Sequence, residues 1–285
     1  MENRKVLVFG EILFDIIDGK EFIGGAPFNF VYYLKTLGID VIFVSAVGND
    51  KRGEKAIELG KKIGIDTSFI NIVDIPTGIV DVYIENGKPS FNIKYPSAWD
   101  YIKISSEMAE RIKEENPQYF YFGSLSLRSE NSYNTFNFLS SMMNNTVKFC
   151  DINLRKPFYN KEILSFLLKK ADILKLNDEE IEEISEILKI KGDMREKMVK
   201  IGERFGIRYI CTTMGEKGAY LLSDRKFYFS PAEKIKVVDT VGAGDAFAAG
   251  LLKGFMDNLS PEEILSLANH LGGKAASTRG AIPSF

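Results

Sequence analysis

From residue 119 onward, short strand-like runs alternate with helical patterns, and this alternation restricts the chain to few folds. The strand-like runs begin at 119 (YFYFG), 147 (VKFCDIN), 172 (DILKLN) and 207 (IRYICTTM), and the helical patterns lie near 129–143, 160–170, 178–188, 193–205, 244–257 and 261–277. Strands that alternate with helices favour a mainly parallel sheet covered by helices. The sequence therefore predicts an α/β fold, a doubly wound sheet with helices on both faces.

Two stretches interrupt this alternation. Residues 11–24 (EILFDIIDGKEFIG) and 77–100 are β-rich, and Asn86-Gly87 in the second is typical of a hairpin turn. No repeat, low-complexity tract or linker divides the chain. We expect one domain over residues 1–285, with a small β-sheet inserted from about 11–24 and 77–100.

The charge balance argues against nucleic acid or a membrane as partner. Lys and Arg total 37 against 39 Asp and Glu, so the chain has no net positive field. The first residues, MENRKVLVFG, have neither the length nor the flanks of a signal peptide or membrane span. We therefore expect a cytoplasmic protein that binds a small molecule.

The cysteines and the histidine give little sign of metal chemistry. Cys150 and Cys211 end apolar strand-like runs, which predicts buried thiols. His270 lies in an apolar helical pattern without a second ligand at metal spacing, which favours a structural or adenine-side role.

Polar residues follow the predicted parallel strands where each strand ends. Asp151 and Asn153 follow one strand, Asn177 and Thr213 follow the next two, and the loop 239–245 precedes a helix. Ligands of parallel sheets bind beyond the carboxyl ends of the strands. We therefore expect these residues to meet at one edge of the sheet.

The loop DTVGAGDAF, residues 239–247, combines small residues with a carboxylate at the start of a helical pattern. A glycine turn that enters a helix leaves backbone N–H groups exposed to bind an anion. The helix dipole favours the ionised form of Asp245. The loop therefore predicts an anion site beside a proton acceptor.

Neither of the common nucleotide motifs is present. GNDKRGEK at 48–55 has Glu54 where a P-loop needs lysine, and GAGDAF at 242–247 has Phe247 where the dinucleotide motif needs glycine. The polar set still suits phosphoryl transfer, which needs N–H donors, positioning and a base.

Two further segments allow a functional and a structural interpretation. In NDEE at 177–180, Glu180 could hold hydrated Mg²⁺, while a capping box with Asn177 explains the same pattern. In TTMGEKG, Thr213 and Gly215 could contact a phosphate or form an ordinary hairpin turn.

Seven motifs in this order resemble the ribokinase-like carbohydrate kinases of the PfkB family, over essentially the whole chain. They are GEILFD (10–15), GGAPFNF (24–30), VGNDKRG (47–53), DINLR (151–155), NDEE (177–180), TMGEKG (213–218) and DTVGAGDAFAAG (239–250). The resemblance implies a doubly wound α/β domain, a small β-sheet lid over the sugar, ATP as phosphoryl donor, and Mg²⁺.

The resemblance also implies residue roles. Asp245 matches the base that deprotonates the acceptor hydroxyl, and Gly242, Ala243 and Gly244 match the anion hole. The residues matched to ATP are Asn177, Thr213, Gly215, Gly218 and Asn269, with Glu180 binding Mg²⁺ through water. Those assigned to the sugar are Asp15, Gly25, Asn29, Phe91, Trp99, Asn153 and Arg155. Packing equally explains the aromatic residues, and a surface ion pair explains Arg155. A potassium site near Asp239 is a further implication.

GGAPFNF, DINLR and YPSAWD are most similar to the fructokinase branch, which implies that D-fructose is converted to fructose 6-phosphate. Phe28, Ile152 and Met214 depart from that branch. A 2-keto-3-deoxygluconate kinase, whose acidic sugar Arg155 could bind, and a ribokinase are the enzymatic alternatives. A catalytically silent sugar or nucleotide sensor is the non-enzymatic one. The apolar strands of the lid further predict a homodimer.

Overall fold

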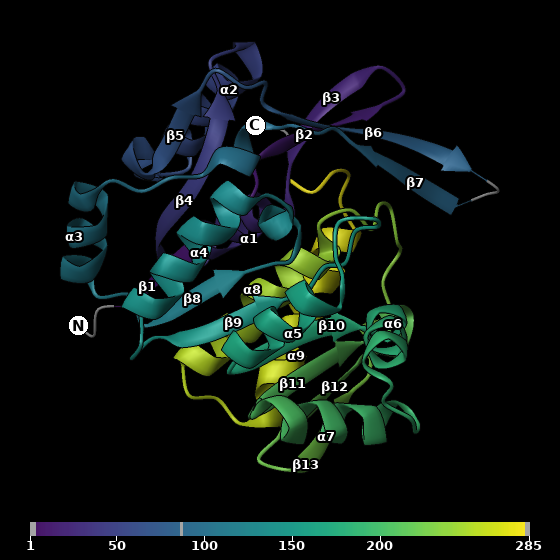
Figure 1. Cartoon of the computed structure of the whole chain (residues 1–285). Coiled ribbons are helices and arrows are strands. Elements are labelled where there is room, and N and C mark those ends of the chain that lie inside the picture. The colour runs from purple at the N-terminus through teal and green to yellow at the C-terminus, as the bar shows by residue number, and fades with distance from the viewer. Residues whose placement is uncertain (1–3, 86–87, 283–285) are drawn as a thin grey trace. The chain divides into compact units, whose positions relative to one another are not determined.

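The structure, a computed structural model, describes residues 4–85 and 88–282 (Figure 1). Within these ranges the chain forms two compact units. Unit 1 comprises residues 4–118 and 126–144, and unit 2 comprises residues 119–125 and 145–282. The expected single domain stays a prediction.

Unit 1 contains three parallel strands and a separate small sheet. The parallel strands are β1 (Lys5–Phe9), β4 (Asp40–Gly48) and β5 (Ile70–Val73), in the order β1-β4-β5. Its helices are α1 (Ala26–Thr36), α2 (Lys51–Lys62), α3 (Ser106–Glu115) and α4 (Glu130–Met142), with short 3₁₀ turns at Thr67–Phe69, Ala98–Tyr101 and, at its boundary with unit 2, Leu125–Arg128. Eight of the nine residues of β4 are buried, as expected for a central parallel strand.

The small sheet confirms the additional β structure predicted from 11–24 and 77–100. Its strands are β2 (Leu13–Ile17), β3 (Lys20–Gly24), β6 (Gly78–Glu85) and β7 (Lys88–Ile93), in the order β3-β2-β6-β7. β6 and β7 pair antiparallel, as the predicted hairpin requires. The turn residues Asn86 and Gly87 lie outside the described residues.

Unit 2 contains a six-stranded array in the order β13-β12-β11-β10-β9-β8. The strands are β8 (Tyr119–Phe122), β9 (Val147–Asp151), β10 (Ile173–Asn177), β11 (Tyr209–Thr213), β12 (Ala219–Ser223) and β13 (Lys226–Ser230). β8, β9, β10 and β11 run parallel, whereas β12 pairs antiparallel with β11 and β13 pairs antiparallel with β12.

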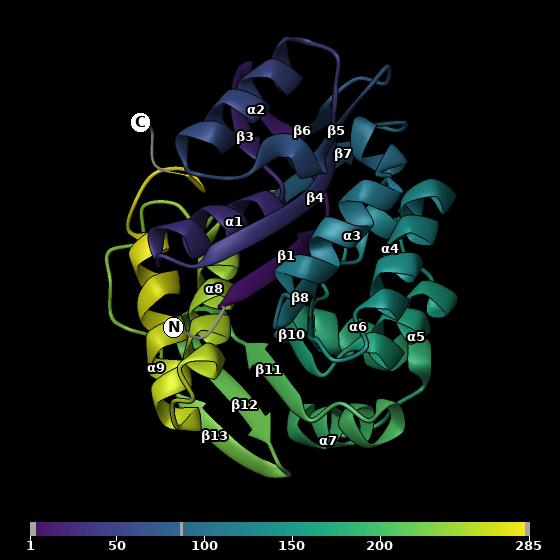
Figure 2. The same cartoon turned by 90° about the vertical axis from the view of Figure 1, so that its left-hand side faces the viewer.

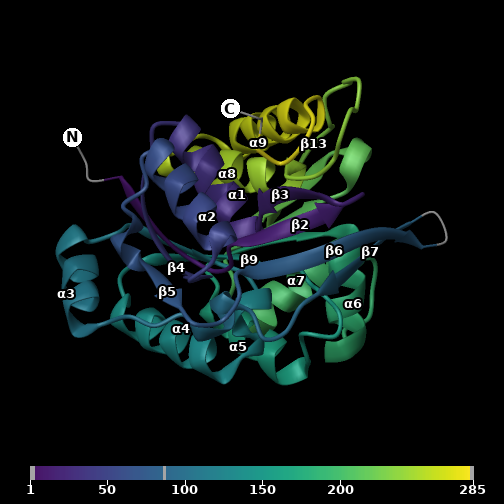
Figure 3. The same cartoon turned by 90° about the horizontal axis from the view of Figure 1, so that it is seen from above.

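Helices cover both faces of the unit 2 sheet (Figures 2 and 3). On one face lie α5 (Lys161–Lys170), α6 (Asp178–Leu188) and α7 (Met194–Phe205), and on the other lie α8 (Ala243–Met256) and α9 (Pro261–Ala276). The predicted α/β fold class is therefore confirmed. No helix of the described residues is long and apolar enough to cross a membrane.

The two cysteines are buried free thiols, as predicted. Burial raises the pKa of Cys211 to about 12 and raises that of Cys150 well above its ordinary value. Both thiols are therefore protonated at neutral pH and serve as packing groups.

Asp50 fixes the start of α2 and connects it to the segment before β6. Its Oδ1 accepts the Gly53 N–H at 2.8 Å, and its Oδ2 accepts the N–H of the buried Thr77 at 2.8 Å. We expect Asp50→Ala to lower the free energy of unfolding by about 2 kcal/mol or more, because it removes a cap and leaves a buried N–H unpaired. Urea unfolding measures this loss.

Ser105→Ala is the matched control, because Ser105 caps α3 through one hydrogen bond to the Met108 N–H at 3.1 Å. We expect a loss of about 1 kcal/mol there. Burial opposes the charge of Asp50, but hydrogen bonds from Thr77 and Gly53 outweigh burial and lower its pKa. The loss of unfolding free energy in Asp50→Ala is therefore greatest at neutral pH. It becomes smaller at acid pH, where Asp50 of the unmodified protein is protonated. Equal losses in the two variants would contradict the assigned role of Asp50.

Candidate active site

The strand ends of unit 2 bring together the polar residues that the sequence singled out. β9 ends at Asp151, β10 at Asn177 and β11 at Thr213. In the parallel register Lys175 lies opposite Asp151, and Asn177 lies opposite Thr213. The predicted edge is therefore confirmed for these three strands. Asn153, two residues beyond β9, has a left-handed backbone with φ of 41°.

The start of α8 forms the predicted glycine turn. Gly242 is the N-cap with φ of 78°, and a Cβ there would lie 2.7 Å from the Ala281 Cα, so both conformation and space require glycine. The first hydrogen bond of the helix runs from the Ala246 N–H to the Gly242 carbonyl at 2.9 Å. The N–H groups of the turn before it have no partner within the helix ladder. Asp245 lies in this first turn, where the helix dipole favours a negative charge.

Asp239 fixes the loop that precedes α8. Its Oδ1 accepts the Val241 N–H at 3.0 Å, and its Oδ2 accepts the Gly280 N–H at 2.9 Å. The carboxylate thus joins the loop before α8 to the segment at Gly280, and the resemblance implied a potassium site near Asp239. The potassium site stays a prediction.

Asn177 and Glu180 form a capping box at the start of α6. The Asn177 Oδ1 accepts the Glu180 N–H at 2.8 Å, and the Glu180 Oε2 accepts the Asn177 N–H at 2.8 Å. The Glu180 Oε1 also accepts the Leu154 N–H at 2.9 Å, and burial raises the pKa of this carboxyl. The structural interpretation of NDEE is therefore correct in its geometry.

A capping box does not exclude the predicted magnesium role. Each oxygen of Glu180 uses one lone pair for a backbone N–H and retains another. Among the described residues no group of three His, Cys, Asp or Glu side chains could hold a metal directly. These residues fit Mg²⁺ that keeps most of its waters and is bound chiefly by phosphate oxygens, with Glu180 contacting a water.

A buried ion pair at this edge was not predicted. The Lys175 Nζ lies 3.0 Å from Asp151 Oδ1 and 3.1 Å from Oδ2, with 10% and 1% of the two side chains exposed. Burial opposes the charge of Lys175, but Asp151, Glu180 and Asp245 outweigh it and raise the lysine pKa. Burial also raises the pKa of Asp151, whose Oδ2 accepts the Tyr121 hydroxyl at 3.3 Å. The signal in the sequence was a lysine inside the apolar run DILKLN.

The predicted ATP residues of the β11–β12 turn lie in a hairpin, as the structural interpretation expected. Gly215 has φ of 55°. Gly218 has φ of 107°, and a Cβ there would lie 2.2 Å from the Ser230 carbonyl oxygen. The Asn269 amide donates to that same carbonyl at 3.2 Å and to the Pro231 carbonyl at 3.1 Å. Gly218 and Asn269 therefore meet at the end of β13. The His270 Nδ1 lies 3.0 Å from the Glu233 Oε1.

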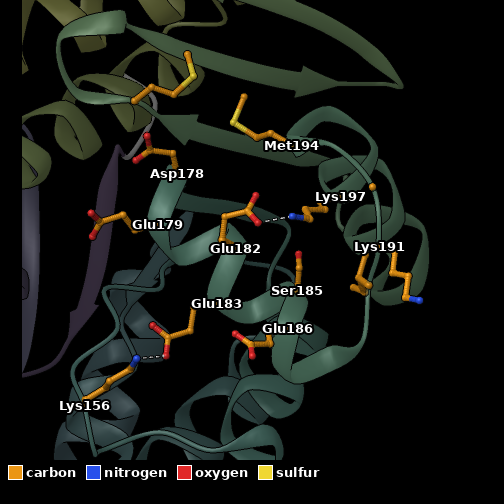
Figure 4. A pocket seen from close by; sticks show the side chains of 13 residues that line it. Lys156, Asp178, Glu179, Glu182, Glu183, Ser185, Glu186, Lys191, Met194 and Lys197 are labelled. Carbon is orange, nitrogen blue, oxygen red and sulfur yellow. Dashed lines mark hydrogen bonds and ion pairs between the residues drawn. The ribbon is translucent and has the colours of Figure 1, made fainter.

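A pocket of unit 2 lies on the exposed side of α6 and reaches Met214 (Figure 4). Acidic and basic side chains line it in unequal number: Asp178, Glu179, Glu182, Glu183 and Glu186 against Lys156, Lys191 and Lys197. Lys156 pairs with Glu183 at 2.8 Å, and Lys197 pairs with Glu182. The remaining excess of negative charge would repel a polyphosphate. We therefore do not assign ATP to this pocket.

In unit 1, three of the predicted sugar residues lie close to one another. A Cβ on Gly24 would lie 2.8 Å from Asp15 Oδ2, so this carboxylate contacts the glycine motif. Gly25 is the N-cap of α1 with φ of 102°, and its carbonyl accepts the Asn29 N–H at 2.9 Å. Asn29 is buried.

The register of the small sheet places Asp15 and Phe91 on one face. Asp15 lies opposite Phe22 and Val80, while Val82, two residues along β6, lies opposite Phe91. Side chains two residues apart on a strand share a face. Phe22 and Phe91 are 41% and 43% exposed, so this face combines a carboxylate with two accessible aromatic rings. Phe22 was not among the predicted residues.

Trp99 differs from its sugar-binding expectation, whereas the contact that Arg155 makes does not test the expectation for that residue. Trp99 is fully buried, its ring lies 3.8 Å from the Arg128 guanidinium, and its Nε1 lies against Gly78. The packing alternative is therefore the correct one for Trp99, because no ring surface is left for a sugar. The Arg155 Nη1 donates to the Leu154 carbonyl at 3.0 Å, and its sugar-binding role stays a prediction.

Comparisons with known proteins agree with this fold and these motifs. The model of the pfkB family carbohydrate kinases matches residues 4–285. A fructokinase of Salmonella typhimurium is 28% identical over 99% of this chain and 96% of its own. An ATP-dependent 6-phosphofructokinase of Thermoanaerobacterium thermosaccharolyticum is 28% identical over 92% of this chain and 84% of its own. The crystal structure of an uncharacterized sugar kinase from Pyrococcus horikoshii in complex with ATP matches with a TM-score of 0.82 and 26% sequence identity. The match covers 97% of this chain and 93% of that one. The chain therefore belongs to the pfkB family of carbohydrate kinases.

The glycines of the α8 turn differ in what a methyl group would meet. In Gly242→Ala the positive φ costs about 1–2 kcal/mol, and the methyl group overlaps Ala281. In Gly244→Ala the Cβ lies at an acceptable 3.4 Å from Lys175 Nζ. We expect Gly242→Ala to lower Tm by several degrees and Gly244→Ala to leave it unchanged or slightly higher, as measured by calorimetry. Equal losses would contradict the cap assignment.

Proposed function

We propose that this protein transfers the γ-phosphoryl group of ATP to a hydroxyl of D-fructose, giving fructose 6-phosphate and ADP. The observation that carries the proposal is the start of α8, where Asp245 lies in the first helical turn, whose N–H groups precede the first hydrogen bond of the helix ladder; that of Ala243 donates to the Thr240 carbonyl at 3.2 Å. A proton acceptor beside an anion site is what phosphoryl transfer to an alcohol requires. ATP as donor is supported by the Pyrococcus relative, which was solved with ATP.

In this proposal each group of the turn has one task. Asp245 accepts the proton of the sugar hydroxyl while the hydroxyl oxygen forms its bond to the γ-phosphorus and the bond to the ADP oxygen breaks. The N–H groups of Gly242, Ala243 and Gly244 stabilise the charge on the transferred group. Their positions are fixed by the helix and by Asp239 on the preceding loop, so no reorganisation is needed during transfer.

The nucleotide is assigned to the strand ends of unit 2. Asn177, Thr213, Gly215 and Gly218 would border it, with Asn269 on the adenine side. Bound Mg²⁺ would neutralise phosphate charge, and Glu180 would hold it through a water. The retained lone pairs of Glu180 and its rigid capping box support this role.

In unit 1 the sugar is assigned to Asp15, Gly25, Asn29 and Phe91, and the sugar-binding roles of Asn153 and Arg155 stay predictions. Asp15 and Asn29 offer a carboxylate and an amide, which suit vicinal hydroxyls. The aromatic rings of Phe22 and Phe91, on the same face as Asp15, suit the apolar face of a sugar ring. Fructose is favoured by the fructokinase relative and by the GGAPFNF and DINLR motifs.

Release of ADP with Mg·ATP tests the substrate across fructose, ribose, glucose, 2-keto-3-deoxygluconate, fructose 6-phosphate and adenosine. We expect fructose to give the highest kcat/KM. A preference for another sugar would overturn fructose while retaining the kinase. No turnover of any of them, with ATP still bound, would favour a silent sensor.

The same assay with Asp245→Asn tests the base. We expect kcat to fall roughly 10²-fold or more while sugar binding, measured by calorimetry, persists. Asp257→Asn is the control, because Asp257 follows α8 at its other end and pairs there with Lys253. Near-normal kcat in Asp245→Asn would rule out Asp245 as the base.

We also propose a homodimer through the small sheet. β3 and β7 are its edge strands, and Tyr83, on the face opposite to Phe22 and Phe91, is 49% exposed. Exposed edges and aromatic side chains favour pairing with a second copy. Light scattering at assay concentration should give twice the chain mass, and Tyr83→Lys should lower it. A monomeric mass for the unmodified protein would reject the dimer.

A further inference from the structure

Lys175 lies among three carboxylates that come from three different elements. Asp151 ends β9, Glu180 lies in the first turn of α6, and Asp245 lies in the first turn of α8. All three interact electrostatically with the Lys175 ammonium. One positive charge is therefore shared among three negative ones at the edge that carries the proposed active site.

The position of the ammonium relative to α8 is defined by Gly244. A Cβ at that residue would lie 3.4 Å from Lys175 Nζ, so the ammonium lies directly against the first turn of the helix. Its hydrogen bonds, at 3.0 and 3.1 Å, go to Asp151. The lysine is thus held by one carboxylate while it faces the turn that carries another.

Three neutral groups also lie near the pair. Tyr121 of β8 donates its hydroxyl to Asp151, and the thiols of Cys150 and Cys211 are buried and protonated. Asp151 of β9 and Lys175 of β10 both interact electrostatically with Asp245. Lys175 favours the ionised form of Asp245, and the Asp151 carboxylate opposes it.

We propose that the Lys175–Asp151 pair is a positioning device for Asp245: Lys175 keeps the base ionised, and Asp151 holds the ammonium in place and limits its effect. This inference rests on the proposed function, in which Asp245 is the base. Lys175 and Asp151 act through Asp245 and do not contact the sugar. The pair would let Asp245 accept a proton at neutral pH although the Asp151 carboxylate also acts on it.

The two partners of the pair predict shifts of opposite sign. Loss of the lysine charge removes an attraction, so Asp245 should take up its proton at higher pH. Loss of the Asp151 charge removes a repulsion and leaves Lys175 less neutralised, so Asp245 should take up its proton at lower pH. A merely structural role of the pair would lower activity without shifts of opposite sign.

The test is a pH titration of the Asp245 carboxyl carbon by NMR, in full-length protein labelled with ¹³C at aspartate carboxyls. Asp245→Asn assigns the signal. We expect Asp151→Asn to lower the titration midpoint of Asp245 by about one pH unit. In the double variant Asp151→Asn, Lys175→Met, we expect a midpoint about one unit higher than in Asp151→Asn alone. The comparison isolates the lysine charge in proteins that both lack the Asp151 charge, so it does not depend on Lys175→Met folding alone.

Lys253→Met is the matched control. Lys253 lies in the last turn of α8, the helix whose first turn holds Asp245. The two residues are about 12 Å apart along the helix axis, which exceeds the screening length of physiological salt. We expect no shift there. An unchanged midpoint in both Asp151 variants, or the same shift in Lys253→Met, would overturn the inference.

The pH profile of kcat/KM with the preferred sugar separates this inference from the proposed function. If both hold, the acid limb moves with the NMR midpoint in each variant. If the midpoints move but no sugar is phosphorylated, the charge coupling stands and the proposed function fails. If sugar is phosphorylated and the midpoints stay, the kinase stands and the positioning role fails.

Discussion

The parallel pairing of β9, β10 and β11 is the constraint on which the candidate site depends. Because these strands run in one direction, Asp151, Asn177 and Thr213 reach the same edge although long helices separate them in sequence. The same register sets Lys175 opposite Asp151 and so creates the buried ion pair. The chemistry at this edge is therefore a consequence of strand direction and register, to which α6 and α8 add their N-terminal turns.

The buried ion pair is better explained by function than by stability. Burial of two charges costs several kcal/mol each, and apolar replacements of such pairs are often neutral or stabilising. Tyr121 and the two lysine contacts satisfy Asp151, while Glu180 and Asp245 each repel Asp151 and attract Lys175. A cluster of this kind is expected where a carboxylate must remain ionised near other carboxylates.

The sequence predicted what local signals determine and missed what depends on distant pairing. The α8 turn could be predicted because glycine, the acidic residue and the apolar run lie within a few residues of one another. The capping box was visible for the same reason. Lys175 and Phe22 were missed because their significance arises from partners on other strands, Asp151 for the lysine and Asp15 for the aromatic ring. Trp99 was misassigned because its partner Arg128 lies in a later segment, and burial cannot be deduced from an aromatic residue alone.

The proposed function assigns transfer and sugar recognition to different residues, and relatives with equal identity to this chain carry different substrate names. The fructokinase and the 6-phosphofructokinase are each 28% identical to this chain. In the proposed function, transfer depends on backbone N–H groups and one aspartate of unit 2, which are independent of the acceptor. Discrimination among sugars depends largely on the side chains of unit 1, where one unsatisfied hydrogen bond changes selectivity by orders of magnitude. On this proposal, replacing Asp15 or the aromatic rings on its face would change the acceptor without changing the mechanism of transfer.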